Sequence, residues 1–184
     1  TASFLDILTT LTWVVAFLLE KTYNRTKTLQ HQSQFEIKNN SQVFNANALA
    51  TAYAHRQIFA ASFNEIKKLD VTAEQKVLEK LLSLYGANLI ATKYLATLYE
   101  GKFIENVNAG ELLQNGILEL LPILKNEAVA LVDAIAPPDF IINSPLGMSD
   151  GKVYQHLEAY MYQTPDTFTR PSWWREVVDF KAKL

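Results

Sequence analysis

Residues 4–19, FLDILTTLTWVVAFLL, carry apolar side chains at intervals of three and four. That spacing gathers them on one face of an α-helix, as a stripe that a neighbouring helix can cover. The apolar positions are Phe4, Ile7, Leu8, Leu11, Val14, Val15, Leu18 and Leu19. Asp6 and three threonines interrupt the run, so it falls short of a membrane-spanning helix. The stretch predicts the buried face of a long helix.

The same periodicity continues along the chain and predicts four long helices. Their expected ranges are residues 3–37, 47–68, 72–100 and 109–135. Asn47 is expected to cap the second helix after an Asn-rich break, and Thr72 with Gln75 to form a capping box. A kink is expected near Pro122, because proline lacks the amide hydrogen of an interior helical residue.

Residues 139–151 carry Pro145, Gly147 and Gly151 and predict an ordered loop, followed by short helices at 152–162 and 173–181. Gly86 lies inside the third helix, which indicates a close helix crossing. The predicted fold class is therefore all-α: an antiparallel bundle of four long helices plus one or two short C-terminal helices, in one domain over residues 1–184.

Composition excludes several functional classes. The chain has 184 residues, of which 49% are hydrophobic and 20% charged, so a disordered protein is excluded. It has no cysteine, hence no disulfide and no thiolate site. Its net charge of −2 lacks the basic excess typical of nucleic-acid binders.

No motif predicts catalysis or metal binding within the chain. His31, His55 and His156 have no metal-ligand spacing, and neither a GxSxG elbow nor a Gly-rich phosphate loop is present. Asp133 stands in an apolar run, where a carboxylate is either a hydrogen-bonded core group or a catalytic acid or base. The structural interpretation is favoured, because no partner is visible.

The last three residues, Ala182, Lys183 and Leu184, form a small–basic–leucine tripeptide similar to the Ser-Lys-Leu peroxisomal address. Such a tail is recognised by an import receptor that captures the free carboxylate, the cation and the apolar end. The alternative is an arbitrary helix end.

Two further motifs accompany this tail. One is AVALVDA at residues 128–134, and the other reads Leu146-Gly147-x-x-Asp150-Gly151-x-Val153-Tyr154-x-x-Leu157. In order and spacing, the motifs and the tail resemble the C-terminal region of peroxisomal acyl-CoA oxidases. Met148 departs from the pattern, since a basic residue is expected there.

The resemblance implies a flavoenzyme of the peroxisomal matrix that binds FAD and a fatty acyl-CoA. A glutamate base removes the α-proton, the β-hydride passes to the flavin, and oxygen reoxidises the flavin to give hydrogen peroxide. That glutamate lies in a preceding domain of the family, so no catalytic residue is assigned here. The chain then resembles the second C-terminal helical domain of a longer homodimeric parent, inactive and without FAD on its own, which fits a start at Thr1.

Residues 146–154 are the best candidate for a shaped site. Leu146, Gly147, Asp150, Gly151 and Tyr154 are expected either to fix the turn into the next helix, which is favoured, or to contact acyl-CoA or flavin of a neighbouring subunit.

Other apolar residues are candidates for a subunit interface, with internal packing as the favoured alternative: Tyr53, Phe59, Trp173 and Trp174. A second hypothesis for the whole chain is a stand-alone helical interaction module without enzymatic activity.

Overall fold

The computed structural model describes residues 4–70 and 72–179, which contain helices and turns but no strand. The all-α fold class is therefore confirmed. The chain divides into two compact units, unit 1 (Thr1–Ala128) and unit 2 (Val129–Leu184).

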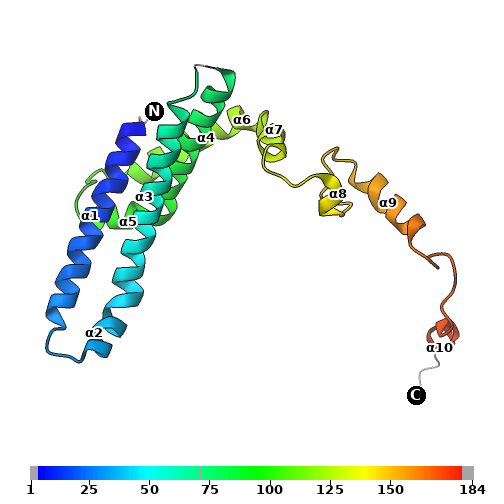
Figure 1. The fold of residues 1–184 in the computed structure, drawn as a ribbon, viewed down its shortest axis with the longest axis horizontal. Coiled ribbons are helices and arrows are strands. Elements are labelled where there is room, and N and C mark those ends of the chain that lie inside the picture. The colour runs from blue at the N-terminus through cyan, green and yellow to red at the C-terminus, as the bar shows by residue number, and fades with distance from the viewer. Residues whose placement is uncertain (1–3, 71, 180–184) are drawn as a thin grey trace. The chain divides into compact units, whose positions relative to one another are not determined.

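Unit 1 contains six α-helices and two π-helical turns among its described residues (Figure 1). These are α1 (Phe4–Thr28), α2 (Gln34–Ser41), the π-turn η1 (Gln42–Ala46), α3 (Asn47–Ile66), α4 (Ala73–Leu89), the π-turn η2 (Ile90–Tyr94), α5 (Leu95–Glu100) and α6 (Ala109–Lys125). The unit is a helical bundle in which α1 packs along α3, α3 against α4, and α4 against α6.

The core of unit 1 is built from the apolar stripes of these helices. The stripe predicted for the first helix is confirmed for Ile7, Leu11, Val14 and Leu18, which are buried. Leu19, also expected in it, is exposed. The other buried members come mainly from α3, α4, η2 and α5: Ala52, Phe59, Leu82, Leu89, Ile90, Tyr94 and Leu98. Burying such side chains is the main favourable contribution to folding.

Gly86 permits a close helix approach in this core, as the sequence predicted. A Cβ atom at this position would lie 2.7 Å from Cγ2 of Ile7 and 2.7 Å from Cε2 of Phe59. The absence of a side chain at Gly86 therefore lets α4 approach α1 and α3 together.

The first helix ends earlier than residue 37. It stops at Thr28, and a separate helix starts after Ser33. Ser33 Oγ accepts a hydrogen bond from the Glu36 amide, and the Glu36 carboxylate accepts one from the Ser33 amide. This reciprocal capping box favours a new helix start over continuation.

The break expected at residues 39–47 is wrong, and so is the cap at Asn47. The backbone runs from α2 through η1 into α3, and Asn47 has helical angles. Ser41 is buried and donates its hydroxyl to the Ile37 carbonyl oxygen at 2.6 Å. Helix continuity here is set by packing against α1, which outweighs the weak helix propensity of asparagine.

The start of α4 is confirmed in part. Thr72 Oγ1 accepts a hydrogen bond from the Gln75 amide at 3.2 Å. The Gln75 side chain does not return to Thr72; it donates to the carbonyl oxygen of Ile66 at 3.3 Å. It therefore links the start of α4 to the end of α3.

The kink predicted near Pro122 stays a prediction, but the helix expected over residues 109–135 is shorter than predicted. Pro122 lies inside α6, and the helix instead ends at Lys125, where the Glu127 amide donates to the Leu124 carbonyl oxygen in a tight turn. Proline removes only one backbone hydrogen bond, and the helix continues through it.

Unit 2 follows with four short helices joined by loops. They are α7 (Ala128–Asp133, which begins at the unit boundary), α8 (Asp139–Ile142), α9 (Val153–Gln163) and α10 (Trp174–Val178). The helix predicted at 152–162 is thus confirmed as α9. The one expected at 173–181 is confirmed only as the short α10, and its last residues lie outside the described range.

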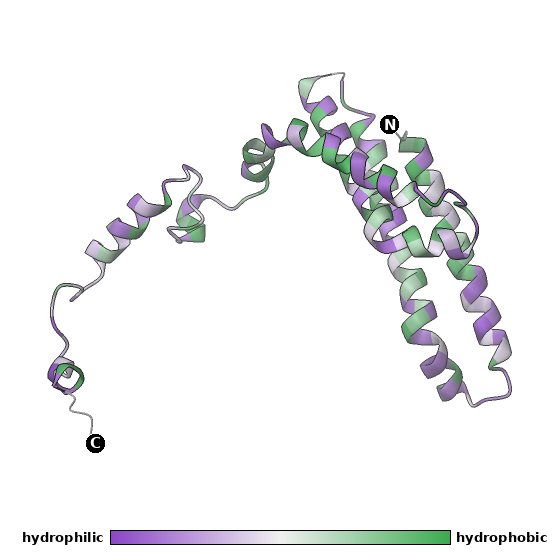
Figure 2. Ribbon diagram, turned by 180° about the vertical axis from the view of Figure 1, so that it is seen from behind, coloured by the Kyte–Doolittle hydropathy of each residue, from purple (hydrophilic) through white to green (hydrophobic). Residues whose placement is uncertain are grey.

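None of the described residues of unit 2 is fully buried. Val129 and Val132 on α7 and Ile135 just after it are exposed, so the expected role of this run as the core face of a fourth long helix is wrong for this chain. Figure 2 shows hydrophobic residues along α7 and α8. Helices this short need tertiary packing for stability, and unit 2 supplies little of it.

Candidate functional site

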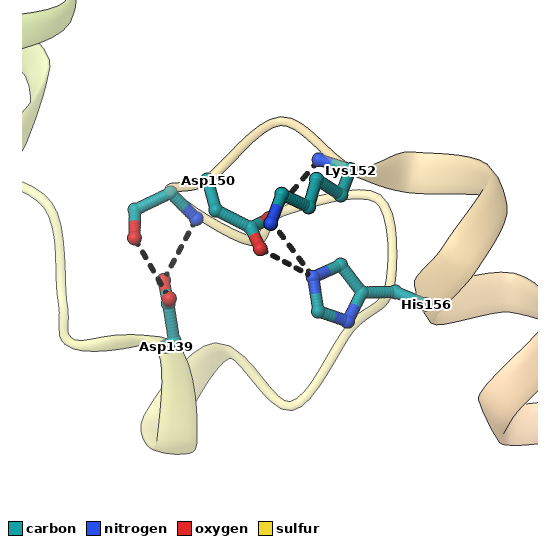
Figure 3. Close-up of polar contacts among 5 residues, drawn as sticks. Asp139, Asp150, Lys152 and His156 are labelled. Atoms are coloured by element: carbon teal, nitrogen blue, oxygen red, sulfur yellow. Dashed lines mark hydrogen bonds and ion pairs between the residues drawn. The ribbon is translucent and has the colours of Figure 1, made fainter.

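The loop between α8 and α9 contains the densest polar network of unit 2 (Figure 3). Asp139, at the start of α8, accepts hydrogen bonds from the Ser149 amide at 3.1 Å and from its hydroxyl at 2.8 Å. One carboxylate thereby fixes the far end of the loop to α8.

Asp150 fixes the other side of the loop to α9. Its carboxylate accepts a hydrogen bond from the Lys152 amide at 3.0 Å and lies 2.8 Å from Nε2 of His156. The hydrogen bond from the Lys152 backbone, followed by that from His156, holds the pKa of Asp150 below its usual value. Asp150 is therefore an anion at neutral pH and acts as the N-terminal anchor of α9.

Two backbone positions shape the same loop. Gly151 has a φ of +69°, a conformation that side chains rarely adopt. Asn143 adopts a left-handed conformation at the end of α8, and its side-chain oxygen accepts a hydrogen bond of 2.6 Å from the Tyr160 hydroxyl. The segment from α8 to α9 is thus closed by side-chain hydrogen bonds at three places.

Apolar side chains project from this closed loop. Leu146 is exposed, and Tyr154 has 87% of its surface accessible. Phe140 on α8 is similarly exposed. The loop thus combines a hydrogen-bonded frame with uncovered apolar groups, which is typical of a surface that contacts something else.

The arrangement does not form a catalytic triad. The Ser149 hydroxyl donates to Asp139, and the His156 ring is bonded to Asp150. A serine nucleophile would need its hydroxyl to face the histidine.

Sequence reasoning missed Asp139, Ser149 and His156 as parts of this network. Asp139 and Ser149 are ten residues apart, and Asp150 and His156 are six, which matches no regular period. The only available signal was the density of hydrogen-bonding residues around Pro145 and Gly147.

Asp133 is exposed, so the prediction that it is a buried core group is wrong. Its apolar neighbours Val129 and Val132 on α7 are exposed as well.

In unit 1, the polar contact that the sequence did not predict is between Nδ1 of His55 and the Tyr94 hydroxyl, which lie 2.7 Å apart.

The interface candidates separate into two groups. Tyr53 and Trp173 are exposed, and Trp174 is half-buried with the Arg170 guanidinium 4.3 Å from its ring centroid. Phe59 has no accessible surface and lies in the core of unit 1, so the favoured alternative of internal packing is confirmed for it, and it is not an interface residue. The tail residues Ala182, Lys183 and Leu184 lie outside the described residues.

A shallow apolar pocket of about 260 Å³ opens among α1, α3 and α4 of unit 1. It is lined by Phe4, Leu5, Phe63, Ile66, Lys67, Glu79 and Leu82. Its volume is below the usual range for cofactor sites, and its lining has little hydrogen-bonding capacity for a dinucleotide. Over residues 4–70 and 72–179, no cluster of histidine and carboxylate side chains is placed to hold a metal, and no helix is long and apolar enough to cross a membrane.

Comparison with known proteins gives one consistent family. Residues 3–183 match the family described as Acyl-CoA oxidase. Peroxisomal acyl-coenzyme A oxidase 3 of Homo sapiens is 35% identical over 167 residues, which are 89% of this chain and 24% of that protein. Acyl-coenzyme A oxidase acox-3 of Caenorhabditis elegans is 32% identical over 97% of this chain and 26% of its own length.

Peroxisomal acyl-coenzyme A oxidase 2 of Mus musculus is 32% identical over 83% of this chain and 22% of that protein. The chain thus spans about a quarter of the length of these relatives. Names that include the peroxisome support the predicted peroxisomal localisation. Since the family match extends over nearly all of its residues, the chain belongs to the acyl-CoA oxidase family.

Proposed function

We propose that this chain is the C-terminal helical part of a peroxisomal, FAD-dependent acyl-CoA oxidase. The parent protein would convert a fatty acyl-CoA and oxygen into trans-2-enoyl-CoA and hydrogen peroxide, the first step of peroxisomal fatty acid β-oxidation. The observation that carries the proposal is the family match over residues 3–183. A stand-alone interaction module is not favoured by a match of this extent.

In that reaction FAD, when bound, accepts the β-hydride of the substrate and passes the electrons to oxygen. The pocket among α1, α3 and α4 does not fit FAD, because it is small and mostly apolar. No catalytic step is therefore assigned to a residue here, and we infer that the fragment alone is inactive.

The role proposed for the chain is structural: to pack against the remainder of the oxidase and to build a homodimer. Exposed apolar side chains support this role. In unit 2 they include Val132, Ile135, Phe140, Ile141, Leu146, Tyr154, Met161 and Phe168. Large apolar groups left in water in such number usually mark an interface.

The loop from Leu146 to Tyr154 would belong to that interface, in contact with another domain or with acyl-CoA or flavin of a neighbouring subunit. Its hydrogen-bonded frame supports this, because a preorganised loop loses less conformational entropy on binding.

Palmitoyl-CoA oxidation by the purified parent protein tests the activity. We expect a flavin absorbance spectrum and peroxide formation that depends on palmitoyl-CoA. The separate 184-residue chain, mixed with FAD and palmitoyl-CoA, is expected to produce no peroxide. A parent protein that holds flavin but oxidises no fatty acyl-CoA would overturn the proposal.

Peroxisomal delivery through Ala182, Lys183 and Leu184 is proposed on the sequence of the tail alone. Removal of Leu184 from a fluorescently tagged parent should leave the protein in the cytosol. Unchanged delivery in cells that lack an untagged partner subunit would contradict an addressing role.

A further inference from the structure

The loop between α8 and α9 contains an aspartate followed directly by a glycine, Asp150–Gly151. Such a pair can react within itself, because glycine has no side chain to shield its amide nitrogen from the preceding carboxyl group. The sequence has one comparable pair, Asn115–Gly116, but it lies inside α6, where helical geometry restrains the backbone. Asp150–Gly151 precedes α9 and lies outside any helix.

The side chain of Asp150 folds back along this part of the backbone (Figure 3). Its carboxylate accepts a hydrogen bond from the Lys152 amide at 3.0 Å, in an Asx-turn that closes over the Gly151 peptide. Gly151 is exposed, and among the described residues a Cβ added to it would meet nothing within 4 Å apart from its chain neighbours. The turn therefore brings the carboxyl group close to the Gly151 nitrogen in an uncrowded place.

Two contacts oppose a reaction between these groups. Nε2 of His156 lies 2.8 Å from Oδ1 and 3.0 Å from Oδ2 of Asp150, and hydrogen bonds of this kind keep a carboxyl group ionised. The Gly151 amide donates to the Met148 carbonyl oxygen at 3.2 Å. An ionised carboxylate is a poor electrophile, and a hydrogen-bonded amide is a poor nucleophile. The closed loop therefore slows the attack, and a substitution can remove the contact made by the His156 side chain.

We propose that Asp150–Gly151 is a site of isoaspartate formation that His156 holds back. The Gly151 nitrogen attacks the carboxyl carbon of Asp150. A nitrogen–carbon bond forms, and the amide proton leaves with the carboxyl hydroxyl as water. Water then opens the succinimide ring. Opening at the former backbone carbonyl leaves Gly151 attached through the side-chain carbon, and opening at the other carbonyl restores aspartate.

Conversion to isoaspartate would open the loop. The product has an extra methylene in the backbone between residues 150 and 151, and its free carboxylate no longer occupies the place of the Asp150 side chain. The Lys152 amide and the His156 ring then lose their common partner. The start of α9 is therefore released from the loop that precedes it.

Ageing the intact parent protein at neutral pH tests the proposal. Peptides are separated by chromatography, and isoaspartate is identified by electron-transfer fragmentation, because its mass equals that of aspartate. We expect isoaspartate at position 150 to form several-fold faster in His156→Ala than in the unaltered protein. It should not form in Asp150→Glu, whose longer side chain would have to close a larger ring.

Two controls accompany these variants. His31→Ala removes an exposed histidine of unit 1 and should leave the rate at Asp150 unchanged. Asp133, which is exposed and followed by Ala134, is the control within each protein and should convert more slowly than Asp150.

Three outcomes would overturn the proposal. They are an absence of isoaspartate at position 150 in both the unaltered protein and His156→Ala, equal rates in these two proteins, and an equal rise at Asp133, which would indicate a general loss of structure. The measurement requires no turnover, so it does not depend on the oxidase activity proposed above.

Discussion

The Tyr94 hydroxyl and Nδ1 of His55 lie 2.7 Å apart and join the π-turn η2 to α3 across the core of unit 1. Tyr94 is almost completely buried, whereas the His55 ring is partly open to solvent. A buried hydroxyl needs a hydrogen-bond partner, and in this core His55 provides it. The two residues are 39 positions apart in sequence, so their hydrogen bond connects two segments that are not adjacent in the chain.

Replacement of Tyr94 by phenylalanine tests the value of this hydrogen bond. We expect Tyr94→Phe to lower the free energy of unfolding by about 1 kcal/mol, the usual net contribution of one such bond. Urea unfolding followed by circular dichroism measures it. Tyr53→Phe is the control, because Tyr53 is exposed and should change stability by less than about 0.5 kcal/mol. Equal effects of the two substitutions would contradict a specific contribution.

The same tyrosine predicts a loss of stability at high pH. Burial, with repulsion from Tyr85 as a smaller cause, raises the pKa of Tyr94 to about 12. Between pH 10 and 12 the unfolded chain loses this proton while the folded chain retains it, so the free energy of unfolding falls. The fall attributable to Tyr94 is at most about 2 to 3 kcal/mol. Tyr94→Phe should show a smaller decrease over this range, and parallel pH profiles would contradict the assignment.

Two helical glycines should respond in opposite ways to alanine. Gly86→Ala places a methyl group against Ile7 and Phe59, and we expect it to destabilise unit 1 by about 1 to 3 kcal/mol. A methyl group added to Gly116, inside α6, would meet nothing within 4 Å apart from the adjoining backbone of α6 itself. Gly116→Ala should therefore stabilise the chain by about 0.5 to 1 kcal/mol through helix propensity. The melting temperatures of the two variants measure these opposite changes in stability. Stabilisation by both substitutions would disprove the close crossing at Gly86.

Phe59 and Phe44 provide a second contrast, between a core ring and a surface ring. Phe59→Ala should cost about 3 to 5 kcal/mol, because the ring is fully buried. Phe44→Ala should change stability by less than about 0.5 kcal/mol, because this ring is already in water. Chemical unfolding of the two variants measures the difference. A small effect at Phe59 would favour the interfacial role that the structure contradicts.

Asp150 predicts an acid-sensitive loop. Its pKa lies below the usual value of 3.8, so its hydrogen bonds persist at neutral pH and are lost as the pH falls below that value. Asp150→Ala should remove these hydrogen bonds at neutral pH. Hydrogen exchange at the amides around Lys152 should then become several-fold faster. Asp133→Ala is the control, because the Asp133 side chain is exposed and lies outside this network. Unchanged exchange in Asp150→Ala would show that the carboxylate does not hold the loop.

Local sequence predicted the helices well where one residue pattern decided them. The stripe from Phe4 to Leu18 and the Thr72 cap were visible, because periodicity and capping are properties of neighbouring residues. The end of α1 was also decided locally, by Ser33 and Glu36, but the polar sequence around them concealed this signal. Continuity from α2 to α3 could not be read locally, since it depends on packing against α1.

By itself, the sequence determined the helical class, the closely packed stripe of α1 and the family, because each is recorded in the order and spacing of residues. Only the tertiary structure decided which apolar residues have partners: Phe59 is buried, while Tyr53 and the run on α7 face solvent. It also paired Asp139 with Ser149 and His55 with Tyr94. The physical reason is that burial and side-chain pairing depend on residues far apart in the chain, whose proximity no local pattern encodes.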